Sequence, residues 1–208
     1  MTGVVAAADP TNTPAGLRLD ARDGRPVPPT AGFGYFADCQ TVDDQLDAVW
    51  ELPPGTRVRV VGVVGHRDAT QPYFDPNLVV LGKCRVTLLE PNPIPTASAA
   101  DLAKAYKADW KAAGKKYGTM EASKALILTG EVAALLTGRL GTEVTLKQPV
   151  DGAEVVLGLP PGAADGLKVG QAVRAKVISS GSFAPALPRI RVGGFLLSEP
   201  KTPLPVAK

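Results

Sequence analysis

An all-β fold with accessory helices is what the sequence predicts: two small β-barrels in tandem, joined by an amphipathic α-helix. Three observations support this. Glycine (22) and proline (20) together make up about a fifth of the 208 residues, a share typical of many short strands separated by turns. Short motifs recur in the same order in both halves of the chain. One segment between the halves has helical periodicity.

The repeat rests on three collinear matches. Residues 1–7 (MTGVVAA) match 128–134 (LTGEVAA), 52–59 (LPPGTRVR) match 167–174 (LKVGQAVR), and 88–91 (LLEP) match 196–200 (LLSEP). Three matches in one order indicate duplication. Because Met1 aligns with a residue inside a strand of the second copy, we expect the chain as given to begin late. Either its start codon is misassigned, or an N-terminal part with a helix, a signal or an anchor is missing.

Each half then contains five segments with the character of strands. In the second half they lie near residues 125–134, 143–147, 154–157, 171–179 and 189–197; in the first half, 16–21, 33–39, 56–64 and 78–89 match the last four. Residues 41–51 carry apolar side chains at helical spacing between the third and fourth strands. This is the layout of an OB fold, and another small five- or six-stranded barrel is the alternative.

The predicted domains follow from this layout. They are residues 1–92, a first OB-like barrel without its N-terminal helix; 93–118, a linker and amphipathic helix; 119–200, a second OB-like barrel; and 201–208, a proline-rich tail.

The clearest helix is predicted over residues 96–117. Ser98 followed by Asp101 resembles a capping box with an aspartate in place of the usual glutamate. An apolar stripe at helical spacing comprises Leu102, Tyr106, Trp110, Ala113 and Tyr117. Lysines lie on the opposite side, where they form either a phosphate-binding face or, as we favour, a solvated face.

Residues 101–106 (DLAKAY), 115–117 (KKY) and 126–132 (LILTGEV) resemble the bacterial tRNA_anti-like OB-fold family, in which a helix with a tyrosine leads into a strand with a Thr-Gly pair. The resemblance implies an OB fold, and it implies little about activity. Members of that family tend to carry one cysteine in the third strand and one in the fifth. Cys39 and Cys84 fit these places in the first repeat, whereas the second repeat has no cysteine and departs from the pattern.

The third and fifth strands of an OB barrel are neighbours, so we expect Cys39 and Cys84 to be adjacent. They would form a disulfide if the protein matures in an oxidising compartment, and two buried thiols are the alternative. The compartment itself is left open by the sequence; an extracytoplasmic or membrane-anchored protein is expected if an N-terminal segment is missing. No apolar run in this chain is long enough for a transmembrane segment.

Residues with catalytic potential are sparse. The one histidine, His66, lies in an expected loop, and there is no zinc-type Cys/His cluster, compact carboxylate set or glycine-rich phosphate loop. The sequence therefore predicts a non-enzyme with no cofactor and no metal site.

Candidate ligand-binding residues gather in the first repeat, on its fourth strand and the loop that follows. They are Arg57, Arg59, His66, Arg67, Tyr73 and Phe74. Cations beside aromatic rings suit the stacking of nucleic-acid bases; alternatively, the aromatic rings close the barrel end and the arginines are solvated. The matching loop of the second repeat, residues 179–185, has one aromatic residue and no charge.

Two functions therefore stay open. The favoured one is a protein-interaction or structural module, and the alternative is weak binding of single-stranded nucleic acid or another polymer through the first barrel. A formal net charge of +3 neutralises few phosphates, which favours the protein partner.

Overall fold

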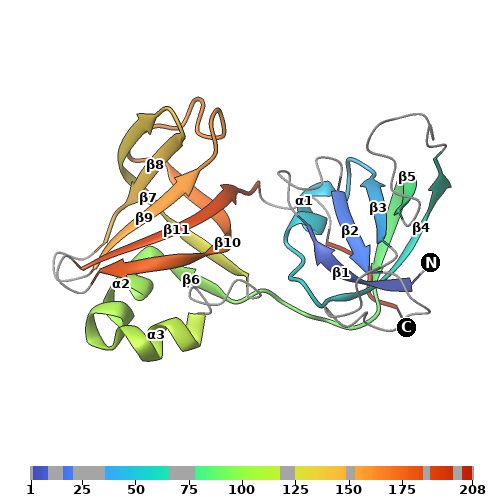
Figure 1. The fold of residues 1–208 in the computed structure, drawn as a ribbon, viewed down its shortest axis with the longest axis horizontal. Coiled ribbons are helices and arrows are strands. Elements are labelled where there is room, and N and C mark those ends of the chain that lie inside the picture. Colours follow the sequence, from blue (N-terminus) through green and yellow to red (C-terminus); the bar gives the residue numbers. More distant parts are fainter. Residues whose placement is uncertain are drawn as a thin grey trace. The chain divides into compact units, whose positions relative to one another are not determined.

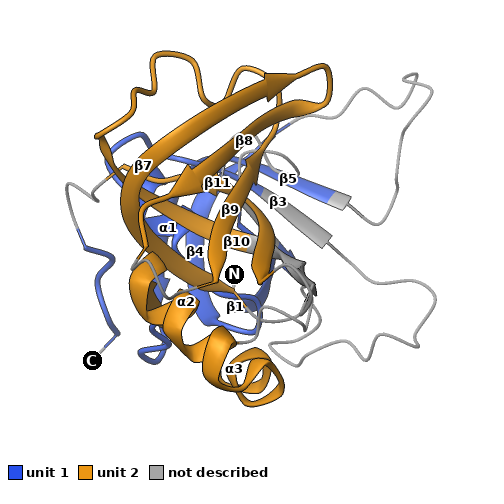
Figure 2. Ribbon diagram, turned by 90° about the vertical axis from the view of Figure 1, so that its left-hand side faces the viewer, with its two compact units in different colours: residues 1–93, 199–208 blue, residues 94–198 orange. Residues whose placement is uncertain are grey.

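The chain forms two compact units, Met1–Pro93 with Glu199–Lys208, and Ile94–Ser198 (Figure 2). The computed structural model describes residues 2–8, 16–20, 36–65, 78–117, 125–148, 153–184, 188–198 and 203–207. Both units are built mainly of strands with few helices, which confirms the predicted fold class. Among these residues, no helix combines the length and the apolar character needed to cross a membrane.

The first unit is a closed barrel of five strands in the order β1-β2-β3-β5-β4 (Figure 1). Its strands are β1 (Thr2–Ala7), β2 (Gly16–Asp20), β3 (Phe36–Thr41), β4 (Arg57–Val64) and β5 (Leu78–Leu88). β1 pairs with β4 and closes the barrel, and β3 runs parallel to β5, whereas the other neighbours are antiparallel. This order is that of an OB fold.

The second unit repeats that order. Its strands are β6 (Thr96–Ser98), β7 (Leu126–Gly138), β8 (Gly141–Leu146), β9 (Glu154–Leu159), β10 (Ala172–Ala184) and β11 (Arg189–Leu196). The pairing of β10 with β7 closes the barrel, and β9 runs parallel to β11. β6 is an addition that pairs in parallel with β7.

The three matched sequence segments lie on equivalent parts of the two barrels. Gly55 and Gly170 both have left-handed backbone, with φ of +86° and +85°. The N–H of Gly55 donates to the carbonyl of Val5, and that of Gly170 donates to the carbonyl of Val132, each at 2.8 Å. Each valine N–H in turn donates to the carbonyl of the residue after the glycine, at 2.9 Å. Such paired geometry is what a duplication would leave, and the duplication itself stays a hypothesis.

The core of the first barrel is closed at one end by α1 (Leu46–Trp50), within the segment expected to be helical. Val49 of this helix is fully buried. Just before the helix, the buried side-chain amide of Gln45 accepts from the N–H of Val86 at 2.9 Å and donates to its carbonyl at 3.3 Å. The amide thus satisfies both backbone groups of one β5 residue, as a neighbouring strand would.

Cys39 and Cys84 form a disulfide between β3 and β5, with their Cα atoms 6.0 Å apart. This confirms the expected adjacency. Both residues are buried in the core of the first barrel. In the β3–β5 register, however, Cys39 lies opposite Leu81 and Cys84 opposite Thr41, so the bond runs diagonally across an irregularity in the pairing.

The irregularity is a bulge in β5, where Lys83 has a left-handed backbone with φ of +51°. On the other side of β5 the register with β4 also shifts, between Val61 and Val63. Gly62 lies in this gap, and a Cβ added to it would be 2.9 Å from the Cys84 sulfur. A glycine therefore interrupts the run of valines on β4 because the disulfide occupies the space of its side chain.

The helical segment of the second unit differs from the single helix expected over residues 96–117. It begins with strand β6 and continues as α2 (Ala99–Ala108) and α3 (Trp110–Tyr117). The break occurs at Asp109, whose carboxylate accepts from the N–H groups of Lys111 and Ala112, both at 3.0 Å. Asp109 thereby starts a new helix as its N-cap. The cap at Ser98 is present as expected, with its hydroxyl accepting from the Asp101 N–H.

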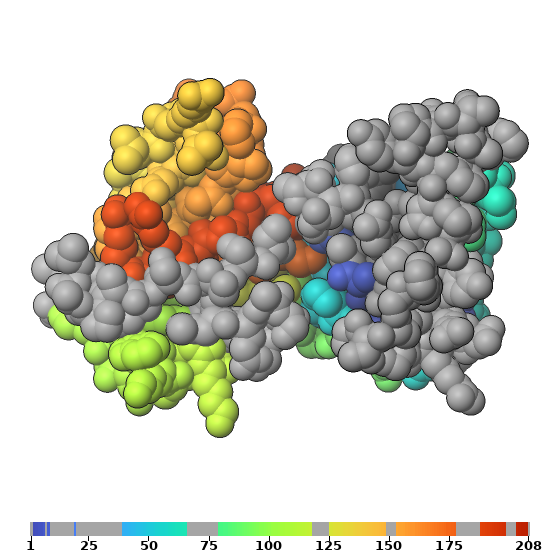
Figure 3. Space-filling view, in the orientation of Figure 1, coloured from blue at the N-terminus to red at the C-terminus, as the bar shows by residue number. Residues whose placement is uncertain are grey.

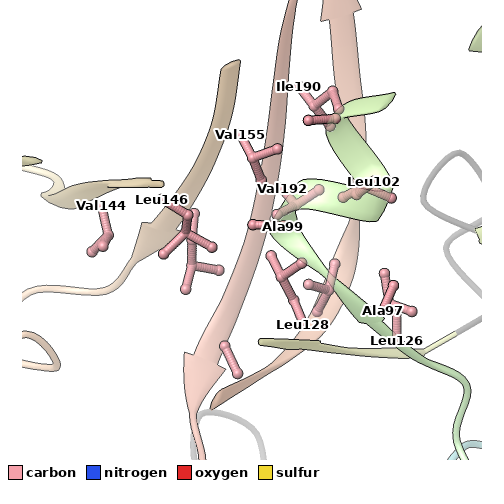
Figure 4. Packing of buried hydrophobic residues seen from close by; sticks show 14 of the residues in the cluster. Ala97, Ala99, Leu102, Leu126, Leu128, Val144, Leu146, Val155, Ile190 and Val192 are labelled. Carbon is pink, nitrogen blue, oxygen red and sulfur yellow. The ribbon is translucent and has the colours of Figure 1, made fainter. Parts of the chain in front are cut away.

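The apolar stripe of these helices packs on the second barrel. Leu102 and Tyr106 are buried in its core, and Trp110 is partly buried against it. Figure 4 shows Leu102 of α2 among the buried side chains of the second barrel. Burial raises the pKa of Tyr106. The lysines of α2 and α3 are all exposed, as both a phosphate-binding face and a solvated face require, so the choice between the two stays a prediction.

Two further segments differ from expectation. Residues 179–184 of the second unit, expected to be a loop, belong to β10, which continues to Ala184 across register shifts in its pairing with β11. The proline-rich tail pairs with the first barrel: the N–H of Leu88 donates to Pro205 and the N–H of Ala207 donates to Leu88, both at 2.8 Å. Leu204 packs against the core of that barrel.

Candidate binding groove on the second barrel

The β7–β8 hairpin turns through only two residues, Arg139 and Leu140, between Gly138 and Gly141. Leu140 is 93% exposed at the tip. Gly141 has a φ of +134°, and a Cβ built there would overlap the carbonyl oxygen of Leu159 at the end of β9. Only glycine permits this approach. The turn is therefore held against β9, and its two side chains extend into solvent.

Side chains alternate between the inside and the outside of the barrel along β8. Thr142, Val144 and Leu146 are buried, so Glu143 lies on the outer face. On that face Glu143 is opposite Leu136 of β7 on one side and Gly158 of β9 on the other.

Gly158 is in turn opposite Gly193 of β11, so two adjacent positions of the outer face carry no side chain. The result is an open groove of about 590 Å³. It is lined by Leu136, Gly138, Arg139, Leu140, Gly141, Thr142, Glu143, Gly158, Leu159 and Arg191. In the space-filling view of Figure 3, the yellow atoms of the β7–β8 hairpin lie at the surface of this unit.

An ion pair crosses the groove from β11 to β8. One guanidinium nitrogen of Arg191 lies 2.8 Å and 3.1 Å from the two carboxylate oxygens of Glu143. This pair cancels one positive and one negative charge. Arg139 is exposed and, within the part of the chain that the structure describes, has no ion-pair partner. The groove is therefore mainly aliphatic, with one uncompensated positive charge at its rim.

The residues that the sequence singled out for ligand binding are in the other barrel. Arg57 and Arg59 are exposed on one face of β4, where they alternate with the buried Val58 and Val60. Arg57 lies 3.9 Å from a carboxylate oxygen of Glu90. β4 is paired with β1 and β5, so these arginines do not lie on the β2–β3 face that OB folds commonly use.

The four remaining candidates, His66, Arg67, Tyr73 and Phe74, lie outside the described residues. The role of all six in ligand binding stays a prediction. Among the described residues, no three histidine, cysteine, aspartate or glutamate side chains gather as they would around a metal ion.

The groove was missed because the sequence reasoning weighed aromatic residues and long loops. A signal for it exists in residues 138–141, Gly-Arg-Leu-Gly, where a leucine stands at a two-residue turn. The other lining residues come from separate strands, and no local motif joins them.

No family model matches the chain, and no curated protein matches it. Among solved structures, it is similar to a murine DNA-binding protein bound with double-stranded DNA, at 11% identity and a TM-score of 0.28, over 97% of each chain. It is also similar to the Ifi202 HINa domain in complex with a 20bp DNA duplex, at 12% identity and a TM-score of 0.27, over 94% of this chain and 93% of that chain. At such TM-scores, neither similarity carries a functional argument for this chain.

Proposed function

We propose that the chain is a non-enzymatic protein-interaction module, and that the groove on the second barrel binds a segment of a partner protein. The observation that carries the proposal is the hollow outer face over Gly158, bordered by the exposed aliphatic side chains of Leu136 and Leu140. Exposed aliphatic surface beside a concave site is typical of interaction surfaces. The position also fits, because OB folds commonly bind ligands on their second and third strands, here β8 and β9.

The chemistry of the groove supports binding over catalysis. Its one carboxylate, that of Glu143, is held by Arg191. Its one hydroxyl, that of the buried Thr142, lies 3.2 Å from the hydroxyl of Thr137 and has no histidine or carboxylate partner among the described contacts. A nucleophile needs an adjacent base. The lining also contains no aromatic ring, and stacking on aromatic rings is the usual means of holding single-stranded nucleic acid.

The disulfide supports an oxidising compartment for this module. Such bonds form and persist outside the reducing cytosol. An extracytoplasmic location is therefore part of the proposal.

The test is selection of a random peptide library on the intact chain, followed by affinity measurements on a Gly158→Val variant. A Cβ at Gly158 would be no closer than 3.7 Å to its nearest neighbour, the Val192 carbonyl, so the strand has room for a Cβ there and the valine methyl groups would occupy part of the groove. We expect selected peptides to bind Gly158→Val at least tenfold more weakly than the unmodified chain.

Gly82→Val is the matched control. It adds the same side chain to a strand of the first barrel, where the nearest atom is 3.9 Å away, and we expect no change in affinity. The proposal is wrong if no peptide is enriched, or if enriched peptides bind Gly158→Val as tightly as the unmodified chain.

Weak binding of single-stranded nucleic acid by the first barrel is a second candidate. It rests on the exposure of Arg57 and Arg59 on one strand face. Contacts of this kind are mainly electrostatic and weaken steeply with salt. Titration of labelled single-stranded DNA and RNA at low salt and at about 0.15 M salt tests it; binding at low salt that Arg59→Ala leaves unchanged would exclude this surface.

A further inference from the structure

One edge of β7 is open beyond the point where β10 begins, opposite Glu131. β7 pairs with β10 through residues 126–131 and with β8 through residues 132–138. On the β10 side, the last bonds are those of Val132 with residues 170 and 171. Beyond Val132, no strand of the described chain pairs with this edge, and residues 133–138 make no further hydrogen bond there.

The alternation of an antiparallel pair shows which backbone groups face the open edge. The N–H of Lys147 donates to the carbonyl of Glu131. Counted from Lys147 toward the start of β8, every second residue therefore makes backbone hydrogen bonds to β7. In the β7–β8 register these residues are opposite residues 134, 136 and 138. The N–H and carbonyl groups of Leu135 and Thr137 consequently point away from β8 and toward the open edge.

The side chains beside this edge are apolar and basic. Leu136 is 69% exposed on the outer face, and Leu140 lies at the adjoining turn. Arg139, between Leu140 and the end of β7, has no ion-pair partner among the described residues. An unpaired strand edge with exposed apolar side chains is a template for another strand.

We infer that the open edge of β7 receives an extended segment of a partner protein as an added strand, with an apolar side chain beside Leu136 and a carboxylate at Arg139. The apolar position follows from strand geometry, because side chains on directly opposite residues of paired strands lie about 4.5–5.5 Å apart. The acidic position follows from charge complementarity with the free guanidinium. This inference rests on the proposed function and adds to it a mode of binding and the chemistry of the partner.

A second copy of the chain fits the edge less well. The carboxylate that this strand offers is that of Glu131, and it is already held by Lys147 at 3.1 Å. Self-pairing would therefore leave Arg139 without a partner, whereas a segment with its own acidic residues supplies one.

The probe is a capped heptapeptide of alternating valine and aspartate residues, added to the intact chain at up to about 1 mM. Exchange at a protected amide slows by the factor 1 + [peptide]/Kd, so a tenfold slowing at this concentration corresponds to a Kd of about 0.1 mM. Hydrogen exchange is followed by NMR at individual amides. We expect exchange at Leu135 and Thr137 to slow at least tenfold. Leu136 and Gly138, already bonded to β8, are internal controls and should not change.

Three comparisons isolate the causes. A peptide N-methylated at alternate residues lacks the donors for strand pairing and should cause no slowing. A valine–lysine heptapeptide should not bind. Arg139→Glu should weaken binding at least tenfold, whereas Lys168→Glu, which reverses an exposed charge in the turn before β10, should not.

Each contrary result overturns the inference: no slowing at Leu135 and Thr137, equal slowing by the valine–lysine or N-methylated peptide, or no effect of Arg139→Glu. Slow exchange at these amides without peptide, in a chain that light scattering shows to be a dimer, would mean that a second copy occupies the edge. Peptides that bind the groove in a manner sensitive to Gly158→Val, but leave the β7 edge unprotected, would refute strand addition and leave the proposed function standing.

Discussion

Reduction of the Cys39–Cys84 bond should destabilise the first barrel by about 4 kcal/mol. The two residues are separated by 45 positions, and the loss of chain entropy on closing a loop of that length in the unfolded state corresponds to about 4 kcal/mol at 25 °C. Small domains have about 5–15 kcal/mol of stability in total, so reduction removes a large part of it. Urea unfolding of the oxidised and reduced protein, followed by a probe in the first barrel, measures the difference.

The packing around the bond supplies an internal control. Gly62→Ala places a methyl group 2.9 Å from the Cys84 sulfur, so it should destabilise the oxidised protein. Its effect should be smaller when Cys39 and Cys84 are both alanine, because the sulfur is then absent. A double-mutant cycle measures this coupling. Two free thiols per denatured, unreduced chain would disprove the bond, and a loss of stability below about 1 kcal/mol on reduction would refute the entropic argument.

Three further predictions concern the second barrel. Gly141→Ala should cost more than about 2 kcal/mol in unfolding free energy, because its Cβ overlaps a carbonyl of β9; an unchanged thermal midpoint would contradict this. Because burial raises the pKa of Tyr106 above its usual value of about 10, its contribution to stability is complete below pH 10 and is lost as the pH rises through the higher folded-state pKa. Tyr106→Phe should therefore flatten the fall in urea midpoint above about pH 10. Leu102→Ala should lower the unfolding free energy by about 2–5 kcal/mol, because Leu102 is buried. Lys104→Ala, at an exposed site, should lower it by less than about 0.5 kcal/mol. Equal losses in denaturant titrations would mean that α2 is not packed as described.

Much of the fold was predictable because it depends on local patterns. Alternation of apolar residues indicated the strands, and turn glycines such as Gly55 and Gly170 marked the entry to equivalent strands of the two barrels. The adjacency of Cys39 and Cys84 followed from the expected pairing of the third and fifth strands. The break between the two helices at Asp109 was missed because the apolar stripe continues across it. Aspartate is nevertheless a common N-cap residue, and here its carboxylate accepts from the N–H of Ala112, three residues later.

The candidate groove and the ligand-binding residues that the sequence predicted lie in different barrels, and the role of those residues stays a prediction. Sequence reasoning favoured aromatic residues in loops of the first barrel, and four of those residues lie outside the described chain. The groove of the second barrel instead depends on residues from separate strands, and no single one of them indicates a binding site in the sequence. Gly158 resembles any strand glycine until its neighbours on the adjoining strands are known.

The sequence alone thus determined the two small barrels and the amphipathic helical segment, since periodicity and turn chemistry act over a few residues. The tertiary structure alone decided where the surface is hollow and where an edge is open. Arg191 and Glu143 are 48 residues apart and meet across Gly158 only through the registers of β8, β9 and β11. The open edge of β7 likewise exists because β10 begins opposite Glu131 while β7 continues to Gly138. Both features depend on the register and lengths of paired strands, which are set by packing over the whole barrel.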